Sequence, residues 1–394
     1  MITIPYVTRV IGVEQWGRLA FVLLVISYLI AVTNWGFNLS ATRKVSVSRA
    51  EHSNLTDIFM VTWSAQWILC ALVIVILGGL VVFSPFFSKD RLLYVYGTGL
   101  VIGNVMQSAW FFNGMERIRD LAVIQLATKL PSVLLILIFV NDPGDAYVVM
   151  GINAATSVMA GVLAVLWIGT VIGISWAKPR WRSMRAELKD GAGLFASTMC
   201  TNLYGALAPT LLGLLIGPLA LGYYNLADRA RGAATTLIHP LTHALFPRMS
   251  HLFAHSHAQA SRLLWLTGKI VMVVSGLMSM CLFILAGPII ALLGGDQFGA
   301  AKQVLEWLSP LPLLTTLSSF FIHQIIIPAE ETKRYYGIII IAGCVGLIVV
   351  VPLIVVKEAI GAALAVLVTE GVLFALLLVV IRKHRGFLRA ESQG

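Results

Sequence analysis

The chain has 394 residues, of which 58% are hydrophobic and 12% charged, and its mean hydropathy is +0.88. Soluble domains carry roughly 25% charged residues, so this composition excludes an ordinary soluble enzyme or binding domain and indicates a protein of the lipid bilayer. The formal net charge of +10 would suit a nucleic-acid partner, but the distribution of the basic residues argues against that class.

Apolar runs long enough to cross a membrane recur along the whole chain. A spanning helix needs about 20 mostly apolar residues, and eleven segments meet that length. No connection between them is long enough to hold a soluble domain. The sequence therefore predicts an all-α integral membrane protein with about eleven transmembrane helices. These helices run approximately over 19–40, 59–84, 93–112, 119–140, 147–173, 192–216, 223–247, 266–293, 302–328, 336–355 and 359–383.

Basic residues are distributed unevenly among the connections. One alternating set of connections carries 18 Lys and Arg residues, and the set between them, with the adjoining Lys302, carries six. By the positive-inside rule the richer set faces the cytoplasm, which places the C-terminus inside the cell and Met1 outside. The surplus charge is therefore a sign of membrane topology, and no nucleic-acid partner is expected. The richer set comprises 41–58, 113–119, 174–191, 248–265, 329–335 and the segment from Arg382 onward.

The beginning of the chain, MITIPYVTRVIGVEQWGRLAF, has the pattern of a helix end, a short exterior turn and the start of the next helix. The stretch LLIGPLALGYYNLADRA repeats it, because Gly217 and Gly222 have the spacing of Gly12 and Gly17. A full apolar helix precedes the second turn, whereas only eleven residues precede Gly12. We therefore expect that the first helix of the first copy is largely missing, through a downstream gene start or a truncation. The alternative is a genuine eleven-helix protein with an exterior N-terminus.

The repeat also predicts the domain organisation. An N-terminal bundle covers 1–175 and contains about five full helices and the remnant of a first. A cytoplasmic linker covers 176–191, and a C-terminal bundle of six helices covers 192–394. Parallel repeats of this kind occur in transporters, with sites at the repeat interface.

Four stretches of the sequence resemble a known family of membrane transporters. PYVTRVIGVEQWGRLAF resembles the end of the family's first helix and its first exterior loop, and WGFNLSATRKVS resembles the end of the second helix. WFFNGMERIRDLAVIQLATKL resembles the junction of the fourth and fifth helices, and GYYNLADRARGA followed by LFPRMS resembles the eighth helix and its cytoplasmic exit. The family is that of the Wzx-type polysaccharide and O-antigen unit flippases of the multidrug/oligosaccharidyl-lipid/polysaccharide (MOP) superfamily, which usually have twelve helices.

The resemblance implies a function, a location and partners. Such proteins move an undecaprenyl-pyrophosphate-linked oligosaccharide from the cytoplasmic to the periplasmic leaflet of the bacterial inner membrane, for O-antigen or exopolysaccharide synthesis. Two six-helix bundles alternate between inward-open and outward-open forms around a central cavity. The partners implied are this lipid-linked oligosaccharide, membrane lipids, a polysaccharide polymerase and a chain-length regulator.

Charges within the predicted helices are the candidates for substrate contact, since a buried pyrophosphate needs fixed cations. A charge at the bilayer centre costs about 2.5–3.5 kcal/mol on insertion scales, so it normally faces a cavity or a partner. Lys129 lies near mid-depth in LATKLPS and is the strongest candidate for a cavity cation, with snorkelling to an interface as the alternative. Pro131, two residues later, is expected to kink or break the helix.

The ADRAR motif supplies three further candidates, about one and a half turns below the second exterior turn. Arg229 and Arg231 point in different directions on a helix, and either could reach the cavity. Asp228 is spaced to pair with Arg231 and to tune it. The alternative is a salt bridge at the exterior rim that only anchors the helix end. Arg9, just before the first turn, could line an outer mouth of the cavity.

Four other charged residues have structural or coupling interpretations. Glu370 lies near the middle of the last predicted helix, where a lone carboxylate suggests H+ or Na+ coupling, or a pair with an unidentified basic residue. Glu116 and Arg117 fall in a short cytoplasmic turn and are expected to form a structural ion pair or a gate latch. Arg43 lies at the cytoplasmic end of its helix, where topology alone would explain it.

The sequence has no pattern typical of an enzyme or a metal site. It lacks the phosphate-cradling GxxxxGK(S/T) motif, so ATP hydrolysis within this chain is not expected. The four cysteines are scattered singly without metal-ligand spacing. Transport would therefore draw on the membrane potential or on an H+ or Na+ gradient, and no cofactor is expected.

Three other functions compete with flipping of a lipid-linked glycan. A multidrug exporter of the same fold would favour carboxylates for cationic drugs, whereas the charges within these helices are mixed and lean towards basic. A membrane polymerase or ligase would carry a large exterior loop, which this sequence lacks. A non-transporting membrane subunit is the third alternative, suggested by the missing helix.

Overall fold

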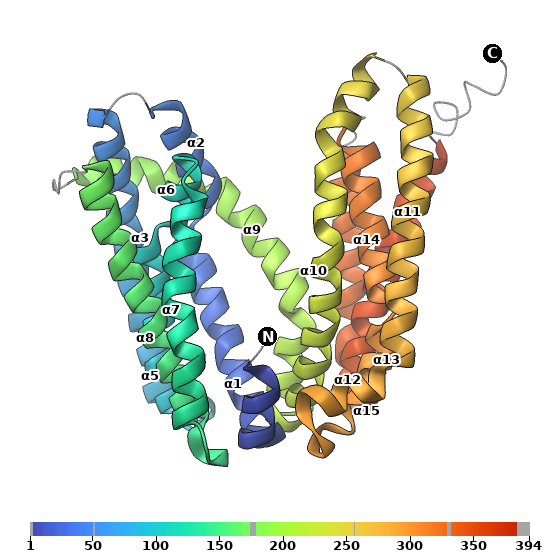
Figure 1. The fold of residues 1–394 in the computed structure, drawn as a ribbon, viewed down its shortest axis with the longest axis horizontal. Coiled ribbons are helices and arrows are strands. Elements are labelled where there is room, and N and C mark those ends of the chain that lie inside the picture. Colours follow the sequence, from blue (N-terminus) through green and yellow to red (C-terminus); the bar gives the residue numbers. More distant parts are fainter. Residues whose placement is uncertain (1–2, 50–51, 174–178, 256, 329–331, 384–394) are drawn as a thin grey trace. The chain divides into compact units, whose positions relative to one another are not determined.

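A computed structural model describes residues 3–49, 52–173, 179–255, 257–328 and 332–383, and every regular element in these ranges is a helix (Figure 1). The chain forms two compact units, Met1–Leu207 and Ala208–Gly394, which we call unit 1 and unit 2. Helical structure covers each of the eleven predicted ranges, with local breaks inside several of them.

Unit 1 contains the helices from α1 to the first part of α9. The long helices α5 and α8 pack tightly along each other, and α7 and α1 pack on that pair (Figure 1). The elements are α1 (Ile4–Asn34), α2 (Phe37–Val47), α3 (His52–Phe83), α4 (Pro85–Ser88), α5 (Arg91–Gln107), α6 (Ala109–Gly114), α7 (Ile118–Phe139), η1 (Pro143–Asp145), α8 (Ala146–Trp167), η2 (Ile168–Ile172) and α9 (Trp181–Leu215).

Unit 2 contains the end of α9 and the helices that follow it. Helix α10 packs on α11, α13, α14 and α15. The elements are α10 (Pro218–His255), α11 (His257–Ile284), α12 (Ala286–Gly294), η3 (Asp296–Phe298), α13 (Ala301–Leu308), α14 (Leu311–Phe321), η4 (Ile322–Ile326) and α15 (Thr332–Lys383).

The lengths and compositions of the helices are those of a membrane protein. Among the described residues, six helical segments are long and apolar enough to cross a bilayer. The segment Gly337–Ile381 has 45 residues, about 68 Å of helix, which is about twice the 30 Å hydrocarbon core of a bilayer. Glu358 interrupts it with non-helical dihedral angles, φ 48° and ψ −123°. The protein is therefore an all-helical, multi-pass membrane protein, and the number of crossings stays a prediction.

The exterior turns predicted near the two repeats are shorter than expected. The turn IGVEQWG was expected to separate two helices, but only Gly12 leaves the helical region, with φ 74° and ψ 176°. In the second copy Gly217 has φ 116°, and α10 begins at the next residue. Glycine adopts positive φ without a Cβ clash, so a single glycine suffices at each break. The parallel repeat itself stays a prediction.

The predicted linker 176–191 is helical over most of its described part. Residues 174–178 lie outside the described residues, and from Trp181 the chain continues as helix α9 into unit 2. Met184, Glu187 and Gly191 are buried, an i, i+3, i+7 pattern that gives the first turns of α9 one face to bury. The compact units divide within α9, after Leu207, and the assignment of two repeat bundles around a central cavity stays a prediction.

Candidate functional site

Three of the predicted charged residues lie together on α10. Arg231 Nε donates to Asp228 Oδ1 at 2.8 Å, and Arg231 Nη2 lies 2.7 Å from the same oxygen. Arg229 turns away and donates from Nε to Asn225 Oδ1 at 3.0 Å. The i, i+3 spacing that suggested a pair of Asp228 with Arg231 therefore gives one, and Arg229 points elsewhere.

The position of this pair along its helix differs from the sequence-based expectation. The motif was placed about one and a half turns below the exterior turn, but α10 begins at Pro218. Asp228 is therefore ten residues into the helix, or about 15 Å along its axis. The helix begins early because Gly217 alone makes the break and proline is favoured in a first turn.

Glu370 on α15 belongs to the same group of charges. Helix α15 packs against α10, and Glu370 interacts electrostatically with Arg231. Tyr224, one turn before Asp228, is buried and also interacts with Asp228. We call Tyr224, Asp228, Arg231 and Glu370 the unit 2 charge cluster. Arg229 also interacts electrostatically with Asp228, so two guanidiniums balance the two carboxylates. A proton or a small cation that binds at a carboxylate would change this balance.

Lys129 occupies a different environment, on the middle turns of α7 in unit 1. Its side chain is exposed, and within the part of the chain that the structure describes it forms no hydrogen bond or ion pair. Pro131 was expected to kink or break this helix, but α7 continues through it from Ile118 to Phe139. Ser132 Oγ donates to the Lys129 carbonyl at 2.7 Å, a back-bond within the helix. The carbonyl that lacks an N–H partner because of Pro131 is that of Ala127, four residues earlier.

Polar side chains beside Lys129 escaped the sequence analysis. Gln125, one turn earlier, donates from Nε2 to Gln107 Oε1 on α5 at 3.0 Å, and Gln107 Nε2 lies 3.4 Å from the Ser157 carbonyl on α8. Asn104, one turn before Gln107, has a buried Oδ1 without a partner among the described residues. The amides are uncharged, so a search restricted to charges missed them. The presence of amide side chains inside apolar runs was the sequence signal that could have identified them.

Arg9 lies on the short helical segment before Gly12. The side chain of Arg9 is exposed. The segment is fixed by Tyr6, whose hydroxyl donates to the Val140 carbonyl after α7 at 2.8 Å. The geometry gives Arg9 a place on the surface of unit 1, and its role at a cavity mouth stays a prediction.

Lys44, which the sequence analysis passed over, connects α2 to α9. Lys44 Nζ lies 2.6 Å from Glu187 Oε2 and 3.2 Å from Asp190 Oδ2. Trp35 adds to the junction, because its Nε1 donates to the Leu188 carbonyl at 2.8 Å. The backbones also approach closely here. A Cβ on Gly36 would lie 2.8 Å from Leu194 Cβ, and one on Gly191 would lie 2.8 Å from the Trp35 carbonyl oxygen.

Arg43 directly precedes Lys44 on α2, and its side chain is exposed. Arg43, Lys44 and Asp190 line a cavity of about 640 Å³ within unit 1. Arg43 forms no hydrogen bond or ion pair with any residue in the described ranges. Whether it acts as a gate stays a prediction, because this placement also suits a topological charge.

Glu116 and Arg117 make local contacts at the turn between α6 and α7. Glu116 Oε1 accepts from Arg49 Nη2 at 2.8 Å, and Arg49 Nε donates to the Gly114 carbonyl at 2.7 Å. The hydrogen bond from Arg49 lowers the pKa of the Glu116 carboxyl below its usual range. Arg117 pairs with Asp120 at 3.5 Å. The two predicted residues thus do not pair with each other, since each has its own partner.

The described residues contain no group of three or more His, Cys, Asp or Glu side chains that could hold a metal ion. The candidate functional residues form one set of polar groups within each unit. Unit 1 presents Lys129 and its neighbouring amides, and unit 2 presents the charge cluster.

Comparison with known proteins identifies relatives along nearly the whole chain. The Escherichia coli (strain K12) protein named "Putative O-antigen transporter" is 27% identical over 391 residues, which cover 98% of this chain and 93% of that protein. The Shigella dysenteriae protein of the same name is 25% identical and covers 97% and 95% of the two chains.

Solved structures show which fold the chain shares. A multidrug resistance MATE family transporter of the MOP superfamily, solved in an inward-facing conformation, matches with a TM-score of 0.75 and 14% identity. The match covers 100% of this chain and 96% of that chain. The lipid II flippase MurJ matches with a TM-score of 0.62 and 12% identity over 95% and 89%. The fold is thus that of MATE- and MurJ-like transporters.

The family follows from the sequence match. Residues 1–253, more than half of the chain, match the family model described as "Polysaccharide biosynthesis protein". This match includes α1 to α9 and most of α10, so it covers Lys129 and the α10 residues of the unit 2 charge cluster. The chain therefore belongs to the polysaccharide biosynthesis protein family.

Proposed function

We propose that this protein flips an oligosaccharide repeat unit linked to undecaprenyl pyrophosphate from the cytoplasmic to the periplasmic leaflet of the bacterial inner membrane. Transport proceeds by alternating access of two helix bundles and supplies O-antigen or exopolysaccharide synthesis. The names of the relatives support transport of an O-antigen component. The observation that carries the proposal is Lys129, an exposed cation on the middle turns of an apolar helix with no partner in the described residues.

The environment of Lys129 suits an anionic, sugar-bearing substrate. An ionised lysine at mid-depth costs about 2.5–3.5 kcal/mol on insertion scales unless it faces water or an opposite charge. A pyrophosphate passing through a cavity supplies that charge. Gln125 and Gln107 lie on the same side and offer amide groups to sugar hydroxyls.

The unit 2 charge cluster suits the coupling step. Asp228 and Glu370 share Arg231, so a proton or Na+ entering the cluster changes how tightly the guanidinium is held. Export of a negatively charged substrate is itself favoured by about 2.3 kcal/mol per charge per 100 mV of interior-negative potential. The cluster would add the energy of an inward H+ or Na+ flow to that term.

An export assay tests the proposal. The gene is deleted in the source bacterium and replaced by Lys129→Ala, Lys129→Arg or the matched loop control Lys89→Ala. Surface glycan and lipid-linked repeat units on the cytoplasmic leaflet of inside-out vesicles are then measured at equal protein levels. Lys129→Ala should reduce surface glycan at least tenfold and accumulate the lipid-linked unit, while Lys129→Arg and Lys89→Ala export normally. Normal export by Lys129→Ala would remove the basis of the proposal.

A multidrug exporter is the second candidate, favoured by the TM-score of 0.75 with a MATE transporter. The carboxylates of Asp228 and Glu370 are groups with which a cationic drug would pair. Deletion of the gene would then increase sensitivity to cationic dyes and leave surface glycan unchanged, which is the reverse of the result expected for a flippase.

A further inference from the structure

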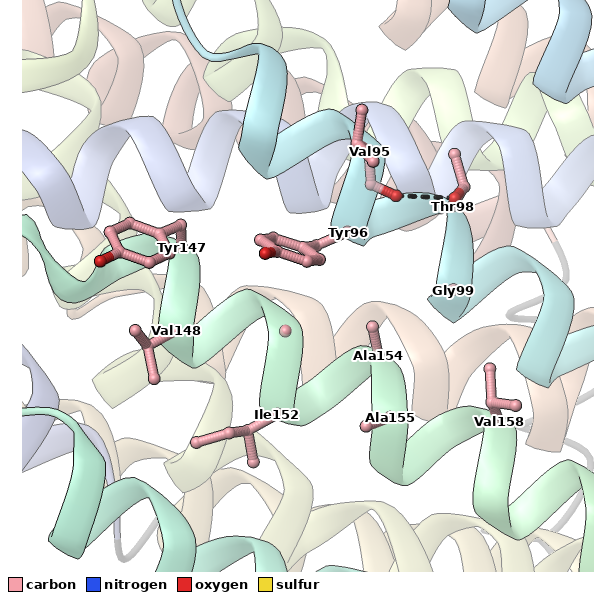
Figure 2. A pocket seen from close by; sticks show the side chains of 11 residues that line it. Val95, Tyr96, Thr98, Gly99, Tyr147, Val148, Ile152, Ala154, Ala155 and Val158 are labelled. Carbon is pink, nitrogen blue, oxygen red and sulfur yellow. Dashed lines mark hydrogen bonds between the residues drawn. The ribbon is translucent and has the colours of Figure 1, made fainter.

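The outer face of the α5 and α8 pair carries a groove that the proposed function does not use (Figure 2). The two helices run parallel and pack closely through small residues. A Cβ on Gly99 would lie 2.8 Å from Ala154 Cβ, and one on Gly103 would overlap Ser157. Small side chains leave a hollow of about 660 Å³ beside this contact. Its lining is Val95, Tyr96, Thr98, Gly99, Tyr147, Val148, Gly151, Ile152, Ala154, Ala155 and Val158.

One end of the groove is polar and the rest is apolar. Figure 2 places the Tyr96 and Tyr147 rings next to each other at one end and Val158 at the other end. Tyr96 and Tyr147 are 41% and 43% exposed, and both lie near the start of their helices. Exposed tyrosines on a membrane protein are typical of the level of lipid headgroups. The polar end of the groove therefore lies at a membrane interface.

A cation stands just beyond this polar end. Arg91 is the first residue of α5 and lies four residues before Val95, on the helix face that lines the groove. Its side chain is exposed, and among the described residues it forms no hydrogen bond or ion pair. Arginine binds phosphate oxygens through paired donors. The mouth of the groove is therefore matched to a phosphate group.

The length of the groove matches one leaflet of a bilayer. Tyr147 and Val158 are eleven residues apart on α8, about 16 Å at 1.5 Å per residue. Half of a hydrocarbon core of about 30 Å is about 15 Å. Beyond the groove, Met159 and Val162 are 45% and 40% exposed, so this face of α8 continues as a lipid-facing surface.

We propose that the groove binds one phosphate-bearing glycerolipid from the leaflet beside the starts of α5 and α8. The lipid phosphate lies at Arg91, the Tyr96 and Tyr147 hydroxyls donate to its phosphate or ester oxygens, and one acyl chain fills the groove as far as Val158. Thr98 adds no hydrogen-bond donor to the wall, because its hydroxyl already donates to the Val95 carbonyl at 2.7 Å. The site goes beyond the proposed transport function and does not depend on it.

Photo-crosslinking tests the site with the full-length protein in nanodiscs. The probe is phosphatidylglycerol with a diazirine in one acyl chain, and mass spectrometry locates the labelled peptides. Ala155 is exposed on the groove wall, so Ala155→Leu fills the groove without disturbing the helix contact. Ala127→Leu, an equally exposed position on α7, is the matched control. Labelling of the α5 and α8 peptides should fall at least fivefold in Ala155→Leu and stay unchanged in Ala127→Leu.

A second comparison tests the phosphate. Arg91→Gln should reduce labelling by the phosphatidylglycerol probe at least threefold, and should leave labelling by a diazirine diacylglycerol, which has no phosphate, unchanged. Equal labelling of Ala155→Leu and the unaltered protein would overturn the proposal. Displacement of the probe by equimolar polyprenyl phosphate would instead assign the groove to a substrate tail. Crosslinks between two copies of the chain that vanish in Ala155→Leu would assign the groove to a second copy of the protein. Displacement by polyprenyl phosphate and crosslinking between copies would each overturn the glycerolipid assignment.

Discussion

In unit 1 the mid-helix cation Lys129 is exposed and has no ion pair with any described residue, whereas in unit 2 Arg231 lies 2.7 Å from Asp228 and also interacts with Glu370. Both cations carry the same kind of cost within a bilayer. Unit 2 offsets it with its own carboxylates, but unit 1 leaves it to water or to a ligand. A charge that must bind a passing substrate has to be available, and a charge that is already paired is suited to switching instead.

The largest expected effect comes from breaking the pair in unit 2. Arg231→Ala removes the guanidinium that pairs with Asp228 and interacts with Glu370. The Asp228 side chain is 36% exposed, so the loss should be about 2–3 kcal/mol, below the loss of about 3–5 kcal/mol for a fully buried pair. Thermal unfolding of the purified protein in detergent should show this loss. The double variant Asp228→Asn with Arg231→Gln should recover at least half of it, since the orphaned charge is gone. If the double variant is as unstable as Arg231→Ala, the unpaired charge of Asp228 is not the cause of the lost stability.

A smaller effect is expected at the junction of α2 and α9. Lys44→Ala leaves Glu187, whose side chain is 9% exposed, without its cation, and an unsatisfied buried group costs about 1–3 kcal/mol. Amide hydrogen exchange in the first turns of α9 should therefore become faster. Lys189→Ala, on the exposed side of the same helix, is the control and should change nothing. Unchanged exchange in Lys44→Ala would mean that the contact of Trp35 with α9 holds the junction alone.

Acid should loosen the turn between α6 and α7. Because Arg49 lowers the pKa of Glu116, the stabilisation from this pair is present above the usual carboxyl pKa and is lost as the pH falls through the lowered value. Amide exchange near Glu116, normalised to intrinsic rates, should rise below a pH of about 4.5. Glu116→Gln should abolish this pH dependence. If amide exchange in this turn of the unaltered protein does not depend on pH, the pair of Arg49 with Glu116 does not stabilise the turn.

The smallest effect on stability is expected at Lys129, although its expected effect on export is large. No described contact is lost in Lys129→Ala, so the free energy of unfolding should change by less than about 0.5 kcal/mol. This result, set beside the loss in Arg231→Ala, would sharpen the contrast between an available and a paired cation. A loss of more than about 1 kcal/mol would show that Lys129 supports the structure instead.

The sequence predicted the helices well because apolar length decides them. It misplaced Asp228 by more than a turn, since it assumed several turn residues where Gly217 alone breaks the helix. It also expected a kink or a break at Pro131. Helix α7 continues through that residue, so the helix is not broken there, and the kink stays a prediction. A proline's missing donor can be tolerated inside a membrane helix when nearby groups satisfy the backbone, and no local pattern announces that.

The sequence could not predict which residues interact between different helices. The pair of Asp228 with Arg231 follows from i, i+3 spacing within one helix. The neighbourhood of Arg231 and Glu370 depends on how α10 and α15 pack, and the bond of Lys44 to Glu187 joins residues 143 positions apart. Such contacts depend on tertiary packing, so a reading of local spacing had no means of finding them.

The close crossing of α9 over the break between α1 and α2 has a consequence for how this sequence can evolve. Gly36 and Gly191 face backbone atoms at about van der Waals contact or closer, with 2.8 Å from a Gly191 Cβ to the Trp35 carbonyl oxygen. Neither position can accept even a methyl group unless the opposing segment shifts. Descendants of this chain must therefore keep both glycines, or change the two positions together with the spacing of the helices that cross there.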